Sequence, residues 1–387
     1  MSSRLSSTLI ELQAAAERIT EQQIAPRARE VDENCLWPAH SMQALAQEGL
    51  LGLHVPESLG GRGQGLLALS VLTETIGKAC PSSALCFGMH CVGTAVIAAK
   101  ATGYQQERYL KPIARGEHIT TLALSESGTG AHFYLPETRL SQDGSNFIVN
   151  GTKQFVTNGG HADSYVVSTV ATGDESGLGD FSCLVVDKDT PGLEWLEPWK
   201  GFGMRGNSSR GLRFSDVRVP QTHLLGEQGD QVWYVFEVVA PYFLMAMAGT
   251  YLGIAQSALE AASAHLRNRS HSYFEEPLAQ IGTLQNRFGE MWVAVEKTRC
   301  LLREAAIRAD LGEPDALPMI LASKAEAGET AVTIANEAMT ICGGQAYREN
   351  SRIAQMLRDA RASHVMSPTT DLLRSWTGRA LLGLPLL

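Results

Sequence analysis

The sequence predicts an α+β protein in which an N-terminal helical domain, a central small β-barrel or β-sandwich domain and a C-terminal four-helix bundle follow one another. Three observations predict this order: apolar residues recur at helical spacing in the first part of the chain, do so again in the last part, and give way in between to short β-branched and aromatic runs. We place the domains at residues 1–119, 120–225 and 226–387.

The N-terminal region shows the periodicity of amphipathic helices. Leu9, Leu12 and Ala16 share one face of a predicted helix, and Leu69 and Leu72 belong to another helix further along. Between them, the glycine- and proline-rich stretch 54–63 interrupts any helix. We therefore expect that stretch to be a turn between two helical segments.

The middle region has the pattern of short strands. The runs 165–170 and 181–186 are rich in β-branched residues, and turn residues such as Asp143 and Gly144 separate the runs. Asn150 and Gly151 form a strong hairpin signal. These features predict a small β domain.

Amphipathic helices in series predict a bundle in the C-terminal region. Leu252, Ala255 and Leu259 form one apolar stripe, and Leu301 and Ala305 form another. Long helical bundles often pair with a second subunit. We therefore expect this bundle to pair with a second subunit.

Composition restricts the possible partners. The chain of 387 residues has a net charge of −9 and a pI near 5.6, which disfavours nucleic acid because phosphate binding needs a basic surface. The N-terminus lacks the apolar stretch of a signal peptide, and we count no uncharged apolar run of the ~18 residues that a membrane span needs. Seven scattered cysteines without a CxxC pair indicate reduced thiols and no metal site. We expect a soluble, cytoplasmic protein that binds neither membranes nor nucleic acid.

Two segments of the middle region carry residues that suit a ligand. In residues 122–130, Ser125 and Thr129 supply hydroxyls at a strand end, and Gly130 allows a ligand to approach the backbone closely. In residues 150–163, Thr157 ends an apolar strand. The alternative interpretations are a glycine-rich turn for the first segment and an ordinary hairpin for the second.

Together, these and other segments resemble the acyl-CoA dehydrogenase family, in the same order and over nearly the whole chain. Residues 124–130 are similar to the T-E-P-x-A-G-S loop of that family and residues 153–159 to its K-x-W-I-T-N-G strand. Further matches are 55–61, 200–205 (K-x-G-x-R), 214–220 (F-x-D-V-x-V-P), 225–229 (L-G-x-x-G), 341–344 (I-x-G-G) and 358–360 (R-D-A).

The resemblance implies an FAD-binding flavoprotein that forms a homotetramer or a homodimer, with the cofactor between the β domain and the C-terminal bundle. It implies that Phe155 and Thr157 lie against the flavin ring, and that Gly343 and Gly344 receive the adenine end of a neighbouring subunit's FAD. The full set of implied cofactor contacts is Leu122, Leu124, Ser125, Gly130, Phe155, Val156, Thr157, His271, Thr340, Gly343, Gly344, Thr369, Thr370 and Asp371.

The sequence departs from the family at the catalytic base. Family members use a glutamate on a C-terminal loop to remove the α-proton of an acyl thioester, and the matched motifs put Ser367 at that position. The alternative base position, on the helix after the β domain, is Phe243. A serine is not a base at neutral pH unless a neighbouring group activates it. The resemblance therefore implies a family member without the usual catalytic glutamate.

Substrate and phosphate contacts differ as well. Pro241 and Leu244 stand where the family has an Asp and an Arg that engage acyl-CoA, and Ala131 stands where a Ser touches pantetheine. His271 replaces an Arg that grips the FAD pyrophosphate, and Thr340 replaces a Gln. Since bidentate Arg–phosphate contacts are strong, we expect an altered FAD affinity.

Three residues are candidates for the catalytic group: Ser367, His90 and His364. His90 lies on a predicted helix that borders the acyl pocket in the family, and His364 precedes Ser367 by one helical turn. Histidine exchanges protons near neutral pH. For both histidines the alternative interpretation is a structural role.

Three functions are compatible with these residues. We favour an FAD-dependent α,β-dehydrogenation of an acyl thioester on CoA or an acyl-carrier protein, with a non-standard base and with an electron-transfer partner or oxygen as the acceptor. The first alternative is a flavin-dependent monooxygenase of the same fold that hydroxylates nitrogen or sulfur. The second is a non-catalytic family member. The fold alone does not choose among them.

Overall fold

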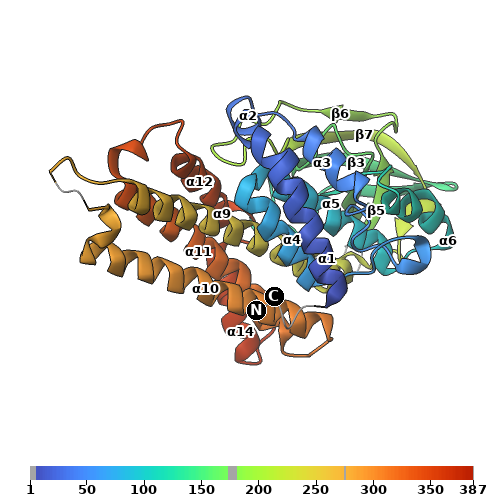
Figure 1. The fold of residues 1–387 in the computed structure, drawn as a ribbon. Helices are drawn as coiled ribbons and strands as arrows, with labels where there is room; N and C mark the ends of the chain where they lie inside the picture. The colour runs from blue at the N-terminus through green and yellow to red at the C-terminus, as the bar shows by residue number, and fades with distance from the viewer. Residues whose placement is uncertain (1–5, 173–180, 274–275, 387) are drawn as a thin grey trace.

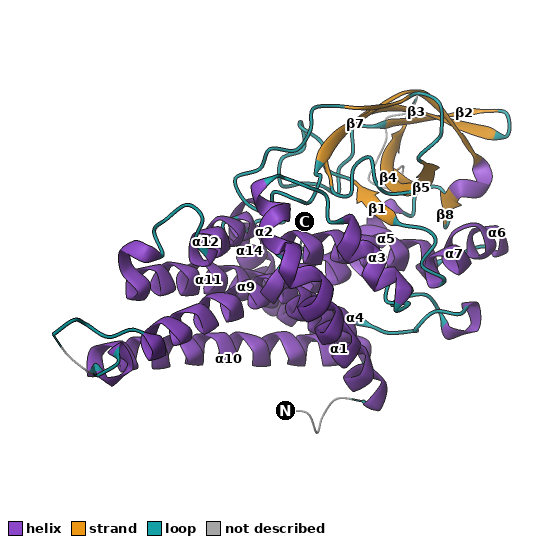
Figure 2. Ribbon diagram, turned by 45° about the horizontal axis from the view of Figure 1, so that its top comes forward, coloured by secondary structure: helices purple, strands orange, loops and turns teal. Residues whose placement is uncertain are grey.

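The predicted order of helices, strands and helices is confirmed in the computed structural model, which describes residues 6–172, 181–273 and 276–386 (Figure 1). The strands gather on one side of the molecule, and the long helices α9, α10 and α11 lie on the other (Figure 2). The N-terminal helices pack between these two parts. The fold class predicted from the sequence is therefore correct.

The N-terminal helices are α1 (Ser7–Ile19), α2 (Ala28–Glu33), α3 (Ala39–Gln47), α4 (Leu66–Ala79), α5 (Pro81–Ala99), α6 (Gly103–Gln105) and α7 (Lys111–Ala114). The Ser6 hydroxyl accepts a hydrogen bond from the Leu9 amide and caps α1. The predicted stripe of Leu9, Leu12 and Ala16 is buried. Helix α5 begins with Pro81, which needs no amide hydrogen at that position.

The strands form one mixed sheet. They are β1 (Thr120–Ala123), β2 (Arg139–Asp143), β3 (Asn146–Val156), β4 (Ser164–Ala171), β5 (Phe181–Asp187), β6 (Leu193–Trp195), β7 (Arg210–Pro220) and β8 (Leu224–Leu225). The strand order is β6-β7-β3-β2-β4-β5-β8, and β1 pairs with β4 in parallel.

A bulge near the end of β3 decides which of its side chains face the helices. The β3–β7 register shifts between Lys153 and Val156, and Phe155 has a φ of 55°. Adjacent strand residues normally point to opposite faces, and the bulge redirects this alternation. Val156 is buried in the sheet core, whereas Phe155 is 64% exposed.

The C-terminal helices are α8 (Gln231–Trp233), α9 (Ala240–Asn268), α10 (Gly282–Asp310), α11 (Ala316–Cys342), α12 (Arg352–Ala360), α13 (Ala362–Val365) and α14 (Thr370–Leu381). Helix α9 packs against α4, α5, α10, α11 and α12. It is therefore the central helix that joins the N-terminal helices to the bundle.

Two helical stretches are long and apolar enough to cross a membrane, so the prediction that no run reaches that length is wrong. They are Pro81–Ala99 and Gln231–Asn268, and 89% and 83% of their most apolar windows are buried inside the protein. Such burial is typical of core helices in soluble proteins. The length and composition of these two helices are therefore not enough to assign either of them to a membrane.

Helices α4 and α9 approach closely through small residues. A Cβ added to Gly253 of α9 would lie 2.5 Å from the Glu74 carbonyl oxygen of α4. A Cβ added to Gly77 of α4 would lie 2.9 Å from the Thr250 carbonyl oxygen of α9. The contact therefore tolerates no side chain at either position without a shift of backbone.

We predict that Gly253→Ala lowers the free energy of unfolding by about 1–3 kcal/mol, because the added methyl group forces the two helices apart. The matched control is Gly289→Ala on α10, where an added Cβ meets no atom within 4 Å. That control should raise stability by about 0.5–1 kcal/mol, since alanine favours a helix over glycine. Urea unfolding measures both, and equal effects of the two variants would contradict the close contact.

Candidate active site

A cavity of about 940 Å³ lies where the β domain meets the C-terminal helices. Its β-domain wall includes Leu122, Leu124, Ser125, Phe155 and Thr157, all of which the resemblance assigned to the cofactor. The first three come from β1 and the loop that follows it, and the last two come from the end of β3. The fold therefore brings together residues that lie more than 25 positions apart in the sequence.

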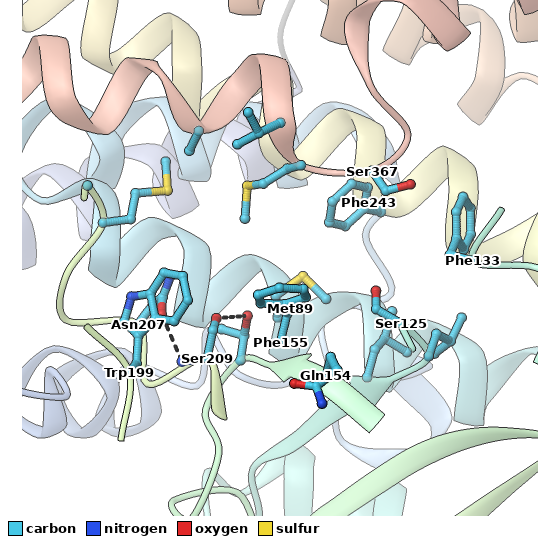
Figure 3. Close-up of a pocket in the computed structure, with 18 of the residues that line it drawn as sticks. Met89, Ser125, Phe133, Gln154, Phe155, Trp199, Asn207, Ser209, Phe243 and Ser367 are labelled. Carbon is cyan, nitrogen blue, oxygen red and sulfur yellow. Dashed lines mark hydrogen bonds between the residues drawn. The ribbon is translucent and has the colours of Figure 1, made fainter. Parts of the chain in front are cut away.

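The opposite wall comes from α9 and from the segment after α12. It includes Ala240, Phe243, Val365, Met366 and Ser367. Phe243 and Ser367 face Ser125 and Phe155 across the cavity in Figure 3. Both positions that the resemblance assigns to a base, Phe243 and Ser367, therefore border the cavity.

Two neighbouring residues of the cofactor set differ in position. Gly130 lines the cavity, as predicted. The side chain of Val156 does not, because the β3 bulge turns it into the sheet core, where it is fully buried. The assignment of the Val156 side chain to the cofactor is therefore corrected.

The residues after Ser367 do not line this cavity. Thr369 precedes α14, Thr370 begins it, and Asp371 lies exposed in its first turn. The buried hydroxyl of Thr370 makes no hydrogen bond within the described parts of the chain. Its oxygen therefore remains able to form a hydrogen bond with a ligand next to the segment that lines the cavity.

The residues that the resemblance assigns to the adenine and pyrophosphate parts of FAD also lie outside this cavity. His271 follows α9, Thr340 is exposed on α11, and Gly343 and Gly344 lie at the exposed end of α11. None of these four lines the described cavity. For Gly343 and Gly344, the resemblance implies contact with the FAD of a neighbouring subunit.

The predicted substrate positions lie beside the cavity but not in its lining. Leu244 is fully buried in the helix packing, and neither it nor Pro241 borders the cavity. Instead Ala240 and Phe243, each one residue earlier on α9, face it. Ala131 contributes its carbonyl oxygen, which accepts a hydrogen bond of 2.9 Å from the Ser367 hydroxyl.

His90 lies outside the cavity, so its predicted catalytic role is corrected. Its Nε2 donates to the Leu51 carbonyl oxygen at 2.9 Å, and its Nδ1 accepts from the Thr120 amide at 3.2 Å. Burial lowers the pKa of His90 to about 4, so the ring is neutral at neutral pH. Both ring nitrogens are used, which supports the structural alternative.

His364 likewise points away from the cavity. Its Nε2 lies 3.1 Å from a Glu329 carboxylate oxygen on α11, and its Nδ1 accepts from Arg361 at 2.6 Å. The cavity lining includes its neighbours Val365 and Met366 but not His364. Its predicted catalytic role is corrected for this reason.

No side chain in the described lining presents a free carboxylate. Glu126 borders the cavity, but its oxygens accept hydrogen bonds from Lys153, from the Thr138 hydroxyl and from the Glu137 and Thr138 amides. The Ser367 hydroxyl donates its hydrogen to Ala131. Among these lining residues, no acidic side chain is therefore available as a base.

Sequence reasoning missed several cavity residues that come from one loop before β7. Trp199, Phe202, Met204, Asn207 and Ser209 all line the cavity. Phe202 is 70% exposed, and the Trp199 indole nitrogen is buried without a partner in the described residues. The K-x-G-x-R match at 200–205 pointed to this loop, but a motif match does not say that its aromatic rings border a site.

Ser209 shows how this loop completes the β-domain wall. The hydroxyls of Ser209 and Thr157 lie 3.0 Å apart, and the Ser209 amide donates to Asn207 Oδ1 at 2.9 Å (Figure 3). Two hydroxyls beside exposed aromatic rings suit a flat heteroaromatic ligand with polar edge atoms. The donor set therefore fits a flavin ring.

A buried ion pair fixes the loop that follows β1. Lys153 of β3 is fully buried and donates to Glu126, to the Leu124 carbonyl oxygen at 3.2 Å and to the Ser168 hydroxyl at 3.0 Å. Burial lowers the pKa of Lys153, and the Glu126 carboxylate opposes this change. The pair therefore locks Leu124 and its neighbour Ser125 against β3.

A second buried carboxyl fixes the aromatic loop. Asp359 of α12 accepts a hydrogen bond of 2.6 Å from the Met204 amide, and burial raises its pKa to about 7. Its neighbour Arg358 pairs with Asp32 and donates to the Phe202 carbonyl oxygen at 3.0 Å. Helix α12 therefore holds the loop that carries Phe202 against the cavity.

We predict that Lys153→Met lowers the free energy of unfolding by about 3–5 kcal/mol, because it leaves the Glu126 carboxylate buried without its cation. Adding Glu126→Gln should recover part of this loss, which a double-mutant cycle in urea measures. The control is Arg213→Met, which removes an exposed ion pair with Glu194 and should cost at most about 1 kcal/mol. Equal losses in the buried and exposed pairs would refute the prediction.

We predict a pH-dependent difference between the wild type and Asp359→Asn. The unfolded carboxyl loses its proton near pH 3.8 and the folded one near pH 7, so the folded state binds more protons between these values. The free energy of unfolding of the wild type should therefore fall, by about 2–4 kcal/mol, relative to that of the variant as the pH rises from about 4 to about 7. A constant difference across this range would show that the pKa is not raised.

Comparison with known proteins covers all three domains. Models of the N-terminal, middle and C-terminal domains of acyl-CoA dehydrogenase match residues 6–117, 121–217 and 241–382. The chain is 33% identical over 366 residues to cyclohex-1-ene-1-carbonyl-CoA dehydrogenase of Geobacter metallireducens. The aligned residues cover 94% of this chain and 95% of that protein.

Solved structures show the same architecture. Butyryl-CoA dehydrogenase from Megasphaera elsdenii superposes with a TM-score of 0.92 at 25% identity, covering 98% of this chain and 99% of that one. The FAD complex of PigA has a TM-score of 0.90 at 22% identity, with 98% and 99% covered, and shares the fold. With three domain models and a full-length relative in agreement, the chain belongs to the acyl-CoA dehydrogenase family.

Proposed function

We propose that this chain is an FAD-dependent oxidoreductase that removes hydrogen from the α and β carbons of an acyl thioester without a glutamate base. The observation that carries the proposal is the cavity between Phe155 and Thr157 on the β-domain side and Phe243 and Ser367 on the helical side. Family membership supports the cofactor and the reaction class. The thioester carrier is CoA or an acyl-carrier protein.

The cavity residues supply what a bound flavin ring needs. When bound, FAD supplies the acceptor for the two electrons that leave the substrate. Phe155 offers an exposed aromatic face, and the hydroxyls of Ser125, Thr157 and Ser209 line the polar side. Lys153 and Glu126 hold this wall in position before any ligand arrives.

The substrate side of the cavity is apolar. Met89, Phe133, Ala240 and Phe243 are among the apolar side chains that line the cavity. Apolar walls orient an acyl chain and exclude water, while the lining offers no free carboxylate to receive the α-proton. The α-proton is therefore received by a group other than a carboxylate of these lining residues.

We further propose an electron acceptor, an oligomeric state and a cellular location for this protein. Electrons pass to an electron-transfer partner or to oxygen. Trp292 and Val293 are more than half exposed on α10, which suits contact with another copy in a homodimer or homotetramer. All seven cysteines are free, in keeping with a cytoplasmic protein.

We predict that the purified protein binds FAD and that the visible flavin absorbance falls when butyryl-CoA or cyclohex-1-ene-1-carbonyl-CoA is added without oxygen. The same acyl groups on a phosphopantetheinylated carrier protein distinguish the two carriers. Flavin binding without bleaching, but with oxygen consumption beside a flavin reductase, would favour a monooxygenase. Failure to bind FAD at any concentration would refute the proposed function.

We predict that Ser367→Glu accelerates thioester-dependent bleaching by about 10²-fold, since a positioned general base contributes on the order of 10²–10⁴ in rate. The matched control is Ser367→Gln, which has nearly the same size and no basic oxygen anion. It should give no acceleration. A gain of equal size in both variants would show that the side-chain volume, and not a base, limits the reaction.

A further inference from the structure

A lysine of α11 lies beneath the segment that carries Ser367. The side chain of Lys324 is fully buried, and its Nζ donates to the carbonyl oxygens of Ser363 at 2.8 Å, Met366 at 3.1 Å and Pro368 at 2.9 Å. An ammonium group has three hydrogens, and here each one has its own carbonyl acceptor. No carboxylate is among its partners in the described chain.

These three carbonyls belong to the 362–368 segment, which forms part of the cavity wall. Val365, Met366 and Ser367 of this segment line the cavity. On its other side the segment is tied by Ser367 to the Ala131 carbonyl oxygen at 2.9 Å, and Tyr251 donates to the Met366 sulfur at 3.1 Å. Lys324 therefore holds from below the same residues that face the ligand space.

The surrounding charges do not neutralise Lys324. Glu329 is occupied by His364 and Arg374, each at 3.1 Å. Burial lowers the pKa of Lys324 to about 7, and burial is the sole cause of the change. Titratable and charged side chains on α11 and on the elements packed against it include Tyr251, Lys297, Glu326, Glu329, Asp359, Arg361, His364, Asp371 and Arg374.

Loss of the proton would change the number of hydrogen bonds. A neutral amine has two hydrogens and a lone pair, so one of the three carbonyl oxygens would face the lone pair and lose its donor. A buried acceptor without a donor costs about 1–3 kcal/mol. The segment is therefore held more firmly when Lys324 is charged.

We propose that Lys324 is a positioning residue. Its charged form holds the 362–368 segment in place beside the cavity, and loss of the Lys324 proton loosens that segment. Its effect on catalysis rests on the proposed function. Its effect on the segment does not, because all the hydrogen bonds involved lie within this chain. The two can therefore be tested separately.

Hydrogen–deuterium exchange of the full-length protein tests the effect on the segment. After correction for intrinsic exchange, wild-type amides of residues 361–370 should exchange about three- to tenfold faster at about pH 8 than at about pH 6. Lys324→Met should exchange at the faster rate at both pH values. No change in the wild type over this range would overturn the proposal, whether or not the variant folds.

Three further variants identify the titrating group. Lys297→Met removes an exposed lysine that pairs with Glu326 on the neighbouring helix surface, and should behave as the wild type. His364→Gln and Asp359→Asn remove the other groups close to the segment that bind or release protons, and should keep the pH response. Loss of the response in either of the last two variants, with retention in Lys324→Met, would assign it to that residue and overturn the proposal.

The catalytic consequence has its own measurement. With FAD bound, the KM of the wild type for the thioester should rise about three- to tenfold from about pH 6 to about pH 8, and Lys324→Met should show the high KM throughout. A flat wild-type KM profile beside a normal exchange response would overturn the catalytic part alone. Failure of FAD binding beside a normal exchange response would count against the proposed function and not against the role of Lys324 in the segment.

Discussion

The buried Lys153–Glu126 ion pair is the interaction on which the cavity depends. Two opposite charges removed from water are stable only when nearly every hydrogen-bonding position is filled, and here the loop backbone, Thr138 and Ser168 fill them. Because the donors and acceptors come from β3, β4 and the loop after β1, the geometry of all three is fixed together. The position of the β-domain wall of the cavity is thus determined by buried polar interactions behind it.

The helical half of the cavity is organised in a comparable way. Asp359 and Lys324 are both buried, both sit behind a segment that lines the cavity, and both bind backbone groups of that segment. The residues Phe202 and Ser367 of these two segments line the cavity. The residues that line the cavity are therefore mostly apolar, and the buried charged residues lie behind them.

Much of this arrangement could be predicted from the sequence because it depends on local patterns. Helical spacing and turn residues predict the three domains, and the motifs around Ser125, Thr157 and Ser367 identify residues that do meet at one cavity. Spacing along the chain could not predict that Val156 faces the core, because the β3 bulge breaks the alternation of side chains. It also could not separate His90 from a catalytic histidine, since its partners Leu51 and Thr120 lie far away in the sequence.

The bulge at Phe155 has a consequence for how the protein can change over evolutionary time. The alternation of side chains along β3 is interrupted at this point, so Val156 faces the sheet core while Phe155 and Thr157 line the cavity. An insertion or deletion of one residue beside the bulge would therefore exchange core-facing and cavity-facing side chains, whereas a point substitution changes one side chain without shifting the register of the others.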